Sequence, residues 1–218
     1  MALLLLLVAA CGGETQNNNS AADAPEANAN VKTGVKPEPD AEVAVIELEN
    51  PAYGRVIVIE LYPNIAPRMV ERFKTLARDG FYNGTAFHRV EPPTVMNPGG
   101  VIQGGDPNSK DDDYMNDGSG QSDLPDLEPE YSDIPYELGT VGAADAGPGT
   151  ANSQFFISLG RNAMWDGRYT AFGRVIQGMN DARVIGSAPT RAGTTNPEPK
   201  VVIKSITLQL RSNFSGGQ

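Results

Sequence analysis

The hydrophobic pattern divides the chain near residue 40. Residues 12–40 contain almost no large apolar side chain, whereas short apolar runs recur from Val43 onward. A segment that cannot bury apolar surface cannot offset the entropy that it loses on ordering. We therefore expect a flexible polar tether over residues 12–40, a folded domain over residues 41–211 and a frayed tail over residues 212–218.

Short β-type runs fill the folded part. They are rich in β-branched and aromatic residues and are separated by Gly, Pro, Asn and Asp, which is typical of strands and turns. The first two should form a hairpin through the turn-like stretch Asn50–Gly54. The predicted strands are Val43–Glu49, Arg55–Leu61, Thr85–Val90, Val101–Gly104, Thr140–Ala143, Gln154–Leu159, Ala171–Val175 and Val201–Leu210.

Only two segments show helical spacing. Ala66–Arg78 has apolar residues three and four positions apart, Pro67 suits the first helical position and Gly80 follows the end. A shorter pattern covers Met179–Ile185. Many short strands with two helices predict a mainly β fold, a closed antiparallel barrel whose open ends the helices cover.

Residues 106–138 form the longest stretch without periodicity, and they are rich in Asp, Asn and Gly. The run Asp111–Asp113 raises the possibility of calcium binding. The spacing of an EF-hand loop and its closing Glu are missing, so we interpret the run as a solvated acidic loop.

Composition removes most other chemistries. The 218-residue chain has a net charge of −10, one cysteine (Cys11) and one histidine (His88). Such a charge disfavours a nucleic-acid partner, and one Cys with one His can form neither an intrachain disulfide nor a His/Cys zinc site. The chain also lacks the Gly-x-Ser-x-Gly and Walker motifs. We expect no metal, no cofactor and no nucleic-acid partner.

The first eleven residues, MALLLLLVAAC, resemble a secretory signal. Val8–Cys11 is similar to the bacterial lipobox, which implies a lipid on Cys11 as the first residue of the mature protein. The alternative is a short buried segment with an incidental cysteine. The polar tether that follows favours the anchor, so we expect a lipid-anchored protein in a bacterial cell envelope, outside the cytoplasm.

Six motifs follow one another in the folded part. They are Phe87–Val90 (FHRV), Val101–Asp106 (VIQGGD), Gly139–Ala144 (GTVGAA), Asn152–Ile157 (NSQFFI), Asp166–Gly167 and Phe172–Val175 (FGRV). In this order the chain resembles the cyclophilins over residues 41–211. The resemblance implies an eight-stranded antiparallel barrel capped by two α-helices, and isomerisation of X-Pro bonds in proline-containing polypeptides, here folding or mature envelope proteins.

The resemblance also implies the roles of the site residues. Arg89 would donate to the twisted imide nitrogen, Gln103 would orient Arg89 and the substrate, and Phe156 would form the floor of the proline pocket. His88 would be structural. The remaining residues implied to contact substrate are Val101, Ala144, Asp145, Gln154, Met164, Trp165 and Tyr169.

Three positions depart from the family pattern. Gly100 stands where relatives carry an aromatic residue, the stretch Glu91–Gly99 is longer, and Met164 occupies a position for tryptophan or phenylalanine. Val95 or Met96 could fold back into the space at Gly100. These departures leave open a catalytically weak proline-peptide-binding or chaperone-like module, and more remotely a structural barrel without a site. Nothing in the sequence indicates an obligate oligomer, so we expect a monomer.

Overall fold

A computed structural model describes residues 31–214 of the chain. The expected signal segment with Cys11 and most of the expected tether lie outside the described residues. Within residues 31–214, no helix is both long and apolar enough to cross a membrane.

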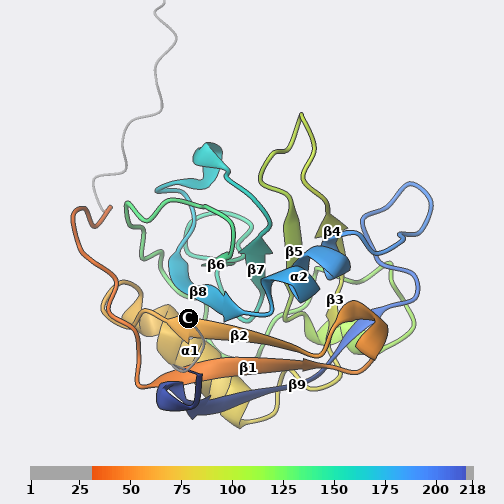
Figure 1. Cartoon of the computed structure of the whole chain (residues 1–218), viewed down its shortest axis with the longest axis horizontal. Coiled ribbons are helices and arrows are strands. Elements are labelled where there is room, and N and C mark those ends of the chain that lie inside the picture. Colours follow the sequence, from red (N-terminus) through yellow and green to blue (C-terminus); the bar gives the residue numbers. More distant parts are fainter. Residues whose placement is uncertain (1–30, 215–218) are drawn as a thin grey trace, which may run out of the picture.

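Nine antiparallel strands form one sheet in the order β3-β9-β1-β2-β8-β6-β7-β5-β4. The two outer strands, β3 and β4, are separated along the chain only by His88, so the chain itself links the two edges and the sheet is a nearly closed barrel (Figure 1). If β3 and β4 count as one strand interrupted at His88, this is the eight-stranded barrel expected from the sequence. The strands are β1 (Glu42–Leu48), β2 (Val56–Leu61), β3 (Ala86–Phe87), β4 (Arg89–Glu91), β5 (Val101–Gly104), β6 (Thr140–Ala143), β7 (Phe155–Ser158), β8 (Ala171–Gln177) and β9 (Val201–Leu210).

The barrel interior is aromatic where α1 (Pro67–Arg78) meets it. Phe73 of α1 is fully buried, and its ring centre lies 5.1 Å from that of Tyr82, 5.3 Å from that of Phe155 and 5.4 Å from that of Phe172. Offset and edge-on contacts of this kind add to the free energy of burying the rings. The helical stripe expected over Ala66–Arg78 is therefore what fastens α1 to the barrel.

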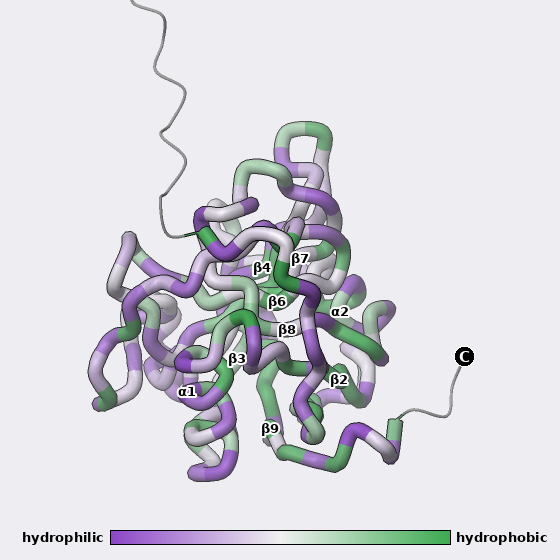
Figure 2. Tube along the Cα trace, turned by 90° about the vertical axis from the view of Figure 1, so that its left-hand side faces the viewer, coloured by the Kyte–Doolittle hydropathy of each residue, from purple (hydrophilic) through white to green (hydrophobic). Residues whose placement is uncertain are grey.

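The second helix, α2 (Met179–Gly186), inserts Ala182 and Ile185 into the same interior cluster and packs against β2, β4 and β5. Figure 1 shows the two helices at separate places on the barrel. Four short 3-10 turns complete the described elements: η1 (Pro51–Tyr53), η2 (Pro107–Lys110), η3 (Ala163–Trp165) and η4 (Arg211–Phe214). Figure 2 shows hydrophobic residues gathered along strands such as β9 and hydrophilic residues on the outlying loops.

The segment before β1 differs from the expected tether. Lys32 pairs with the chain at Tyr131 and Asp133, since its N–H donates to the Tyr131 carbonyl (2.9 Å) and its carbonyl accepts from the Asp133 N–H (3.0 Å). Farther on, the Asp40 N–H donates to the Leu61 carbonyl (2.9 Å), and the Asp40 carboxylate lies 2.7 Å from Lys74 Nζ. Residues 32–40 thus contact the barrel mainly through backbone groups and one ion pair. The hydrophobic pattern did not predict this contact, because the segment has few apolar side chains.

Both ends of the described chain lie on the barrel. Val31 packs beside Gly167, with a side-chain carbon 3.6 Å from where a Cβ on that glycine would lie. At the other end, Phe214 packs against the small cluster of Val43, Val45 and Val58. The prediction of a frayed tail over residues 212–218 is therefore wrong for residues 212–214, which belong to η4.

Candidate functional site

Three of the expected site residues form a row across neighbouring strands. Arg89 on β4 is directly opposite Gln103 on β5, and Gln103 is directly opposite Phe156 on β7. Residues that are opposite one another in adjacent strands project from the same face of a sheet. Phe155 points into the interior cluster, so Phe156 and the rest of the row face outward.

Amide side chains continue this row as a chain of hydrogen bonds. Arg89 Nη1 donates to Gln103 Oε1 (3.2 Å), and Gln103 Nε2 donates to Gln154 Oε1 (3.0 Å). Gln154 Nε2 in turn donates to the carbonyls of Gly118 (3.0 Å) and Gly120 (2.7 Å). Each amide is therefore held in one orientation, and Gln103 presents its oxygen to Arg89 as the sequence suggested.

An apolar cluster lies beside the row. Phe156 is 5 % exposed, and its ring centre lies 5.2 Å from that of Trp165 and 5.4 Å from that of Tyr169, both edge-on. Val101 lies two positions before Gln103 on β5, on the same face, and belongs to the same cluster, as does Ala144. The structure brings together the floor and walls that the sequence assigned separately.

Tyr136 supports this floor, and the sequence reasoning missed it. Its ring is fully buried and stacks on Phe156 at a centre distance of 5.5 Å. Gly142 makes the stack possible, since a Cβ there would lie 2.6 Å from the Phe156 ring and 2.5 Å from Tyr136 Oη. Burial raises the pKa of Tyr136 well above its ordinary value, so the phenol stays neutral. Tyr136 lies in a loop without periodicity, which gave no signal of this role.

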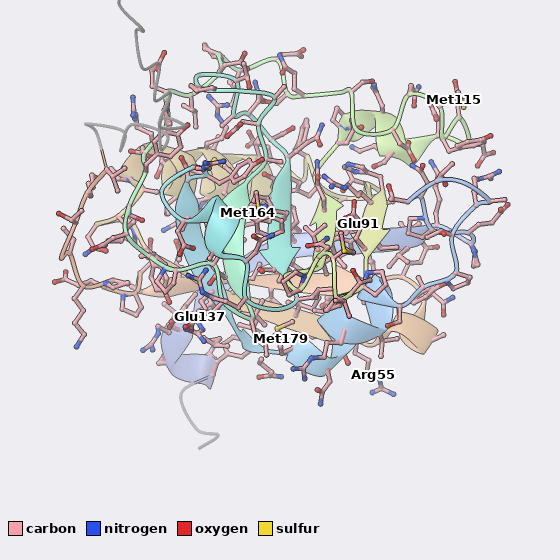
Figure 3. The ribbon with its side chains drawn as sticks, turned by 90° about the horizontal axis from the view of Figure 1, so that it is seen from above. Arg55, Glu91, Met115, Glu137, Met164 and Met179 are labelled. Carbon is pink, nitrogen blue, oxygen red and sulfur yellow. The ribbon has the colours of Figure 1, made fainter. Side chains whose placement is uncertain are left out.

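Asp145 connects two hollows on this face. One is lined by Gln103, Ala144, Asp145 and Gln154, and the other by Asp145, Met164, Trp165, Arg168 and Tyr169. Burial raises the pKa of Asp145, while the Gly147 N–H that it accepts acts in the opposite direction. Met164 is 72 % exposed and forms an open rim (Figure 3).

Glu91 is a further charged residue at the site that the sequence reasoning did not assign. It follows Arg89 by two positions on β4, and its Oε1 accepts a hydrogen bond from Arg89 Nε (2.8 Å). Figure 3 looks down on this side of the molecule, with Glu91 and Met164 labelled. The signal was an acidic residue two positions after the arginine, a spacing that puts both side chains on one face of a strand.

The longer loop between β4 and β5 does not place apolar side chains into the pocket. Val95 and Met96 are 98 % and 93 % exposed, so neither folds back as the sequence had allowed. The loop is the highest projection of the ribbon in Figure 1, and its tip is hydrophobic in Figure 2. Its own backbone fills the space at Gly100: a Cβ there would lie 2.6 Å from the Pro93 nitrogen, and φ is +51°. Glycine is therefore required at this position.

His88 takes no part in the groove. It is 4 % exposed, and burial lowers its pKa to about 4, against an opposing effect of Asp106. The imidazole is thus neutral at pH 7, as expected of a structural histidine. Among residues 31–214, no group of three or more His, Cys, Asp or Glu side chains is arranged to hold a metal ion.

Comparisons with known proteins identify the family of the chain. The family described as "Cyclophilin type peptidyl-prolyl cis-trans isomerase/CLD" matches residues 44–208. A "Probable peptidyl-prolyl cis-trans isomerase" of Brucella suis is 40 % identical over 153 residues, which is 69 % of this chain and 76 % of the relative. The "Peptidyl-prolyl cis-trans isomerase ppi1" of Schizosaccharomyces pombe is 36 % identical over 172 residues, which is 76 % of this chain and all of the relative.

A solved structure gives the same result. The cyclophilin-type peptidyl-prolyl cis-trans isomerase of Cryptosporidium parvum, crystallised in the presence of the dipeptide Ala-Pro, has a TM-score of 0.66 and 25 % identity. The match covers 77 % of this chain and 98 % of that one. The barrel and its groove define a peptide-binding enzyme fold, and the chain belongs to the cyclophilin-type peptidyl-prolyl cis-trans isomerases.

Proposed function

We propose that the outward-facing groove accelerates rotation about X-Pro bonds, with Arg89 as the hydrogen-bond donor to the twisted imide. The observation that carries this proposal is the row in which Arg89, Gln103 and Phe156 are opposite one another on β4, β5 and β7. This row places the Arg89 guanidinium and the Phe156 ring on the same face of the sheet.

The chemistry needs no nucleophile and no proton transfer. Rotation about an X-Pro bond is slow because it breaks amide resonance. In the half-rotated state the nitrogen is no longer planar, and its lone pair can accept a hydrogen bond. A donor directed at that nitrogen binds the half-rotated state better than either planar isomer, which lowers the barrier. The Arg89 guanidinium stays charged and carries several donors in a fixed plane.

The apolar pocket supplies the grip that rotation requires. A proline ring lying on Phe156, between Val101 and Trp165, would be held while the residues before it turn. Ala144, Asp145 and Gln154 line the adjoining hollow, where the peptide backbone on that side would lie. The substrates are then proline-containing polypeptides, in line with the Ala-Pro present with the Cryptosporidium parvum relative. Met164 and Tyr169, at the rim, would contact the flanking residues.

Replacement of the donor tests the proposal. In a fragment comprising residues 31–218, Arg89→Ala should lower kcat/KM for a proline peptide by about 10²- to 10³-fold, the usual effect of removing one transition-state donor. A protease-coupled peptide assay measures this rate. Arg55→Ala is the matched control, because Arg55 is exposed between β1 and β2 and away from the groove (Figure 3).

An Arg89→Ala protein as fast as wild type would remove Arg89 from the mechanism. Proline-peptide binding without faster exchange, measured by NMR, would favour the weakly catalytic binding module instead. That alternative was motivated by Gly100, where the loop backbone now occupies the position of an aromatic side chain.

We also propose that the enzyme acts as a lipid-anchored monomer outside the cytoplasm, on folding or mature envelope proteins. The support is the apolar run of residues 1–10, the small residues before Cys11 and the polar stretch that follows. A lipid at Cys11 would hold the domain at a membrane surface without a spanning helix.

A further inference from the structure

Glu91 contacts the guanidinium of Arg89 along one edge. Arg89 Nε donates to Glu91 Oε1 (2.8 Å), and Arg89 Nη2 lies 2.7 Å from the same oxygen. Residues two apart on a strand project from the same face, so this ion pair is continuous with the groove. The side chains are 46 % and 28 % exposed, which leaves the guanidinium open to a substrate.

The second oxygen of Glu91 is held by the longer loop. Asn97 Nδ2 donates to Glu91 Oε2 (3.0 Å). Asn97 is itself fixed by a tight turn: its N–H donates to Thr94 Oγ1 (2.9 Å), and its carbonyl accepts from the Thr94 N–H (2.9 Å). The loop thus presents an amide to the carboxylate that contacts Arg89.

Arg89 keeps free donors in this arrangement. A guanidinium has five N–H groups. One, at Nε, is donated to Glu91, one at Nη2 faces the same carboxylate, and one at Nη1 is donated to Gln103. The remaining two are available to a substrate, while Glu91 and Gln103 hold the group from two sides.

We propose that Glu91, supported by Asn97 of the β4–β5 loop, is a positioning residue that orients Arg89 for the isomerisation. This inference rests on the proposed function. A guanidinium that is already ordered loses less conformational freedom when substrate binds, and a preorganised donor needs no rearrangement as the bond twists. The negative charge of Glu91 weakens the positive field that Arg89 presents to the substrate. Water screens this effect because the ion pair is partly exposed, so the gain from fixing the orientation of Arg89 is larger.

Kinetics of single and double variants test the assignment on the fragment of residues 31–218. Glu91→Ala should lower kcat/KM by about 3- to 10-fold, the range expected when one long side chain is set free, with the loss mainly in kcat. Asn97→Ala should lower it less, because the Glu91–Arg89 contact remains. In the Arg89→Ala background, Glu91→Ala should change nothing further, since Glu91 acts only through Arg89.

A matched control and a second readout separate this role from a structural one. Glu47→Ala removes another partly exposed ion pair, with Lys204 (3.1 Å) on β1 and β9, and should leave kcat/KM unchanged. NMR of the Arg89 Nε–H group should show slow exchange with water in the wild type and faster exchange in Glu91→Ala.

Two results would overturn the proposal: a Glu91→Ala protein with wild-type or higher kcat/KM, or an Arg89 Nε–H signal that does not respond to this substitution. If the wild type proves inactive, the proposed function fails while the NMR readout still decides whether Glu91 orders Arg89. If the wild type is active and Glu91→Ala is equally active, the function stands and the positioning role is wrong.

Discussion

At the scale of single residues, burial decides which charged groups are available for chemistry. Arg89 and Glu91 are partly exposed and hold each other at the groove. His88, between them and β3 along the chain, is almost completely buried, and its neutral imidazole is withdrawn from substrate. The motif FHRV departs from strict strand alternation at His88, since Phe87 and Val90 both belong to the interior cluster while Arg89 is exposed.

His88 should make stability depend on pH. Its pKa falls from the ordinary 6.5 to about 4 in the folded protein because of burial. Between these values the unfolded chain binds a proton that the folded chain does not. His88 should therefore not lower the free energy of unfolding above pH 6.5. As the pH falls from 6.5 toward 4, the free energy of unfolding should decrease by about 1.4 kcal/mol per pH unit. Urea denaturation between pH 7 and 5 measures this.

The control for this prediction is His88→Phe, which keeps a ring at the site but cannot titrate. Burial raises the pKa values of Asp117 and Asp145, and these groups act in the opposite direction in both proteins. The difference between the two pH profiles isolates His88. Parallel profiles would show that the imidazole is already solvated in the folded state.

At the scale of elements, apart from the interruption at His88, the sequence placed every strand and helix to within two residues. Apolar alternation and helical spacing report which residues are buried, and burial follows the elements closely here. The interruption at His88 was not predicted, because β3 pairs with β9 and β4 with β5, and such pairing is not encoded locally. Tyr136 and Asn97 were missed because their contacts depend on loop conformations, and Glu91 because it lies one residue beyond the predicted strand Thr85–Val90.

The segment of residues 32–40 was missed because it binds through backbone groups rather than apolar side chains. A fragment that begins at residue 41 should have a free energy of unfolding lower than a fragment from residue 31 by about 1–3 kcal/mol. It loses the contact of Asp40 with Lys74, whose side chains are 15 % and 10 % exposed, and breaking such a buried pair is costly. Glu42, 2.9 Å from Lys74, limits the loss. Chemical denaturation of the two fragments measures the difference.

The same comparison has a pH signature. Burial alone would raise the pKa of Asp40, but its bond with Lys74 brings the pKa below the ordinary 3.8. The pair therefore stabilises the fold above pH 3.8, and its contribution is lost as the pH falls further. The difference in the free energy of unfolding between the two fragments should therefore become smaller below pH 3.8. A gap of the same size at pH 7 and pH 3 would mean that backbone contacts alone account for it.

At the scale of the whole molecule, a nearly closed barrel leaves its outer face free for the site while the interior provides stability. Sequence motifs identified Arg89, Gln103 and Phe156 because the family spacing fixes them on three strands. The register that makes them neighbours became evident only in the structure. The net charge of −10 disfavours binding to the phosphate backbone of a nucleic acid.

The proposed attachment to a membrane involves the whole chain and has its own test. We expect Cys11→Ser, expressed with its N-terminal segment, to move the protein from the membrane fraction to the soluble extracytoplasmic fraction. The reason is that a thiol is required for the lipid, and without it only a polar chain remains to hold the domain. Fractionation and mass spectrometry of the mature N-terminus measure the outcome. An unmodified wild-type chain that still begins at Met1 would contradict it.

The contact of Val31 with Gly167 places residue 31 beside the proposed substrate site. Gly167 lies in sequence between Trp165 and Tyr169, which line one of the two hollows of the proposed site. A partner or surface that is linked to the chain at residue 31 would then lie near this hollow rather than near strands β1 and β9. A flexible proline-containing segment that is held near residue 31 would therefore be close to the proposed site of isomerisation.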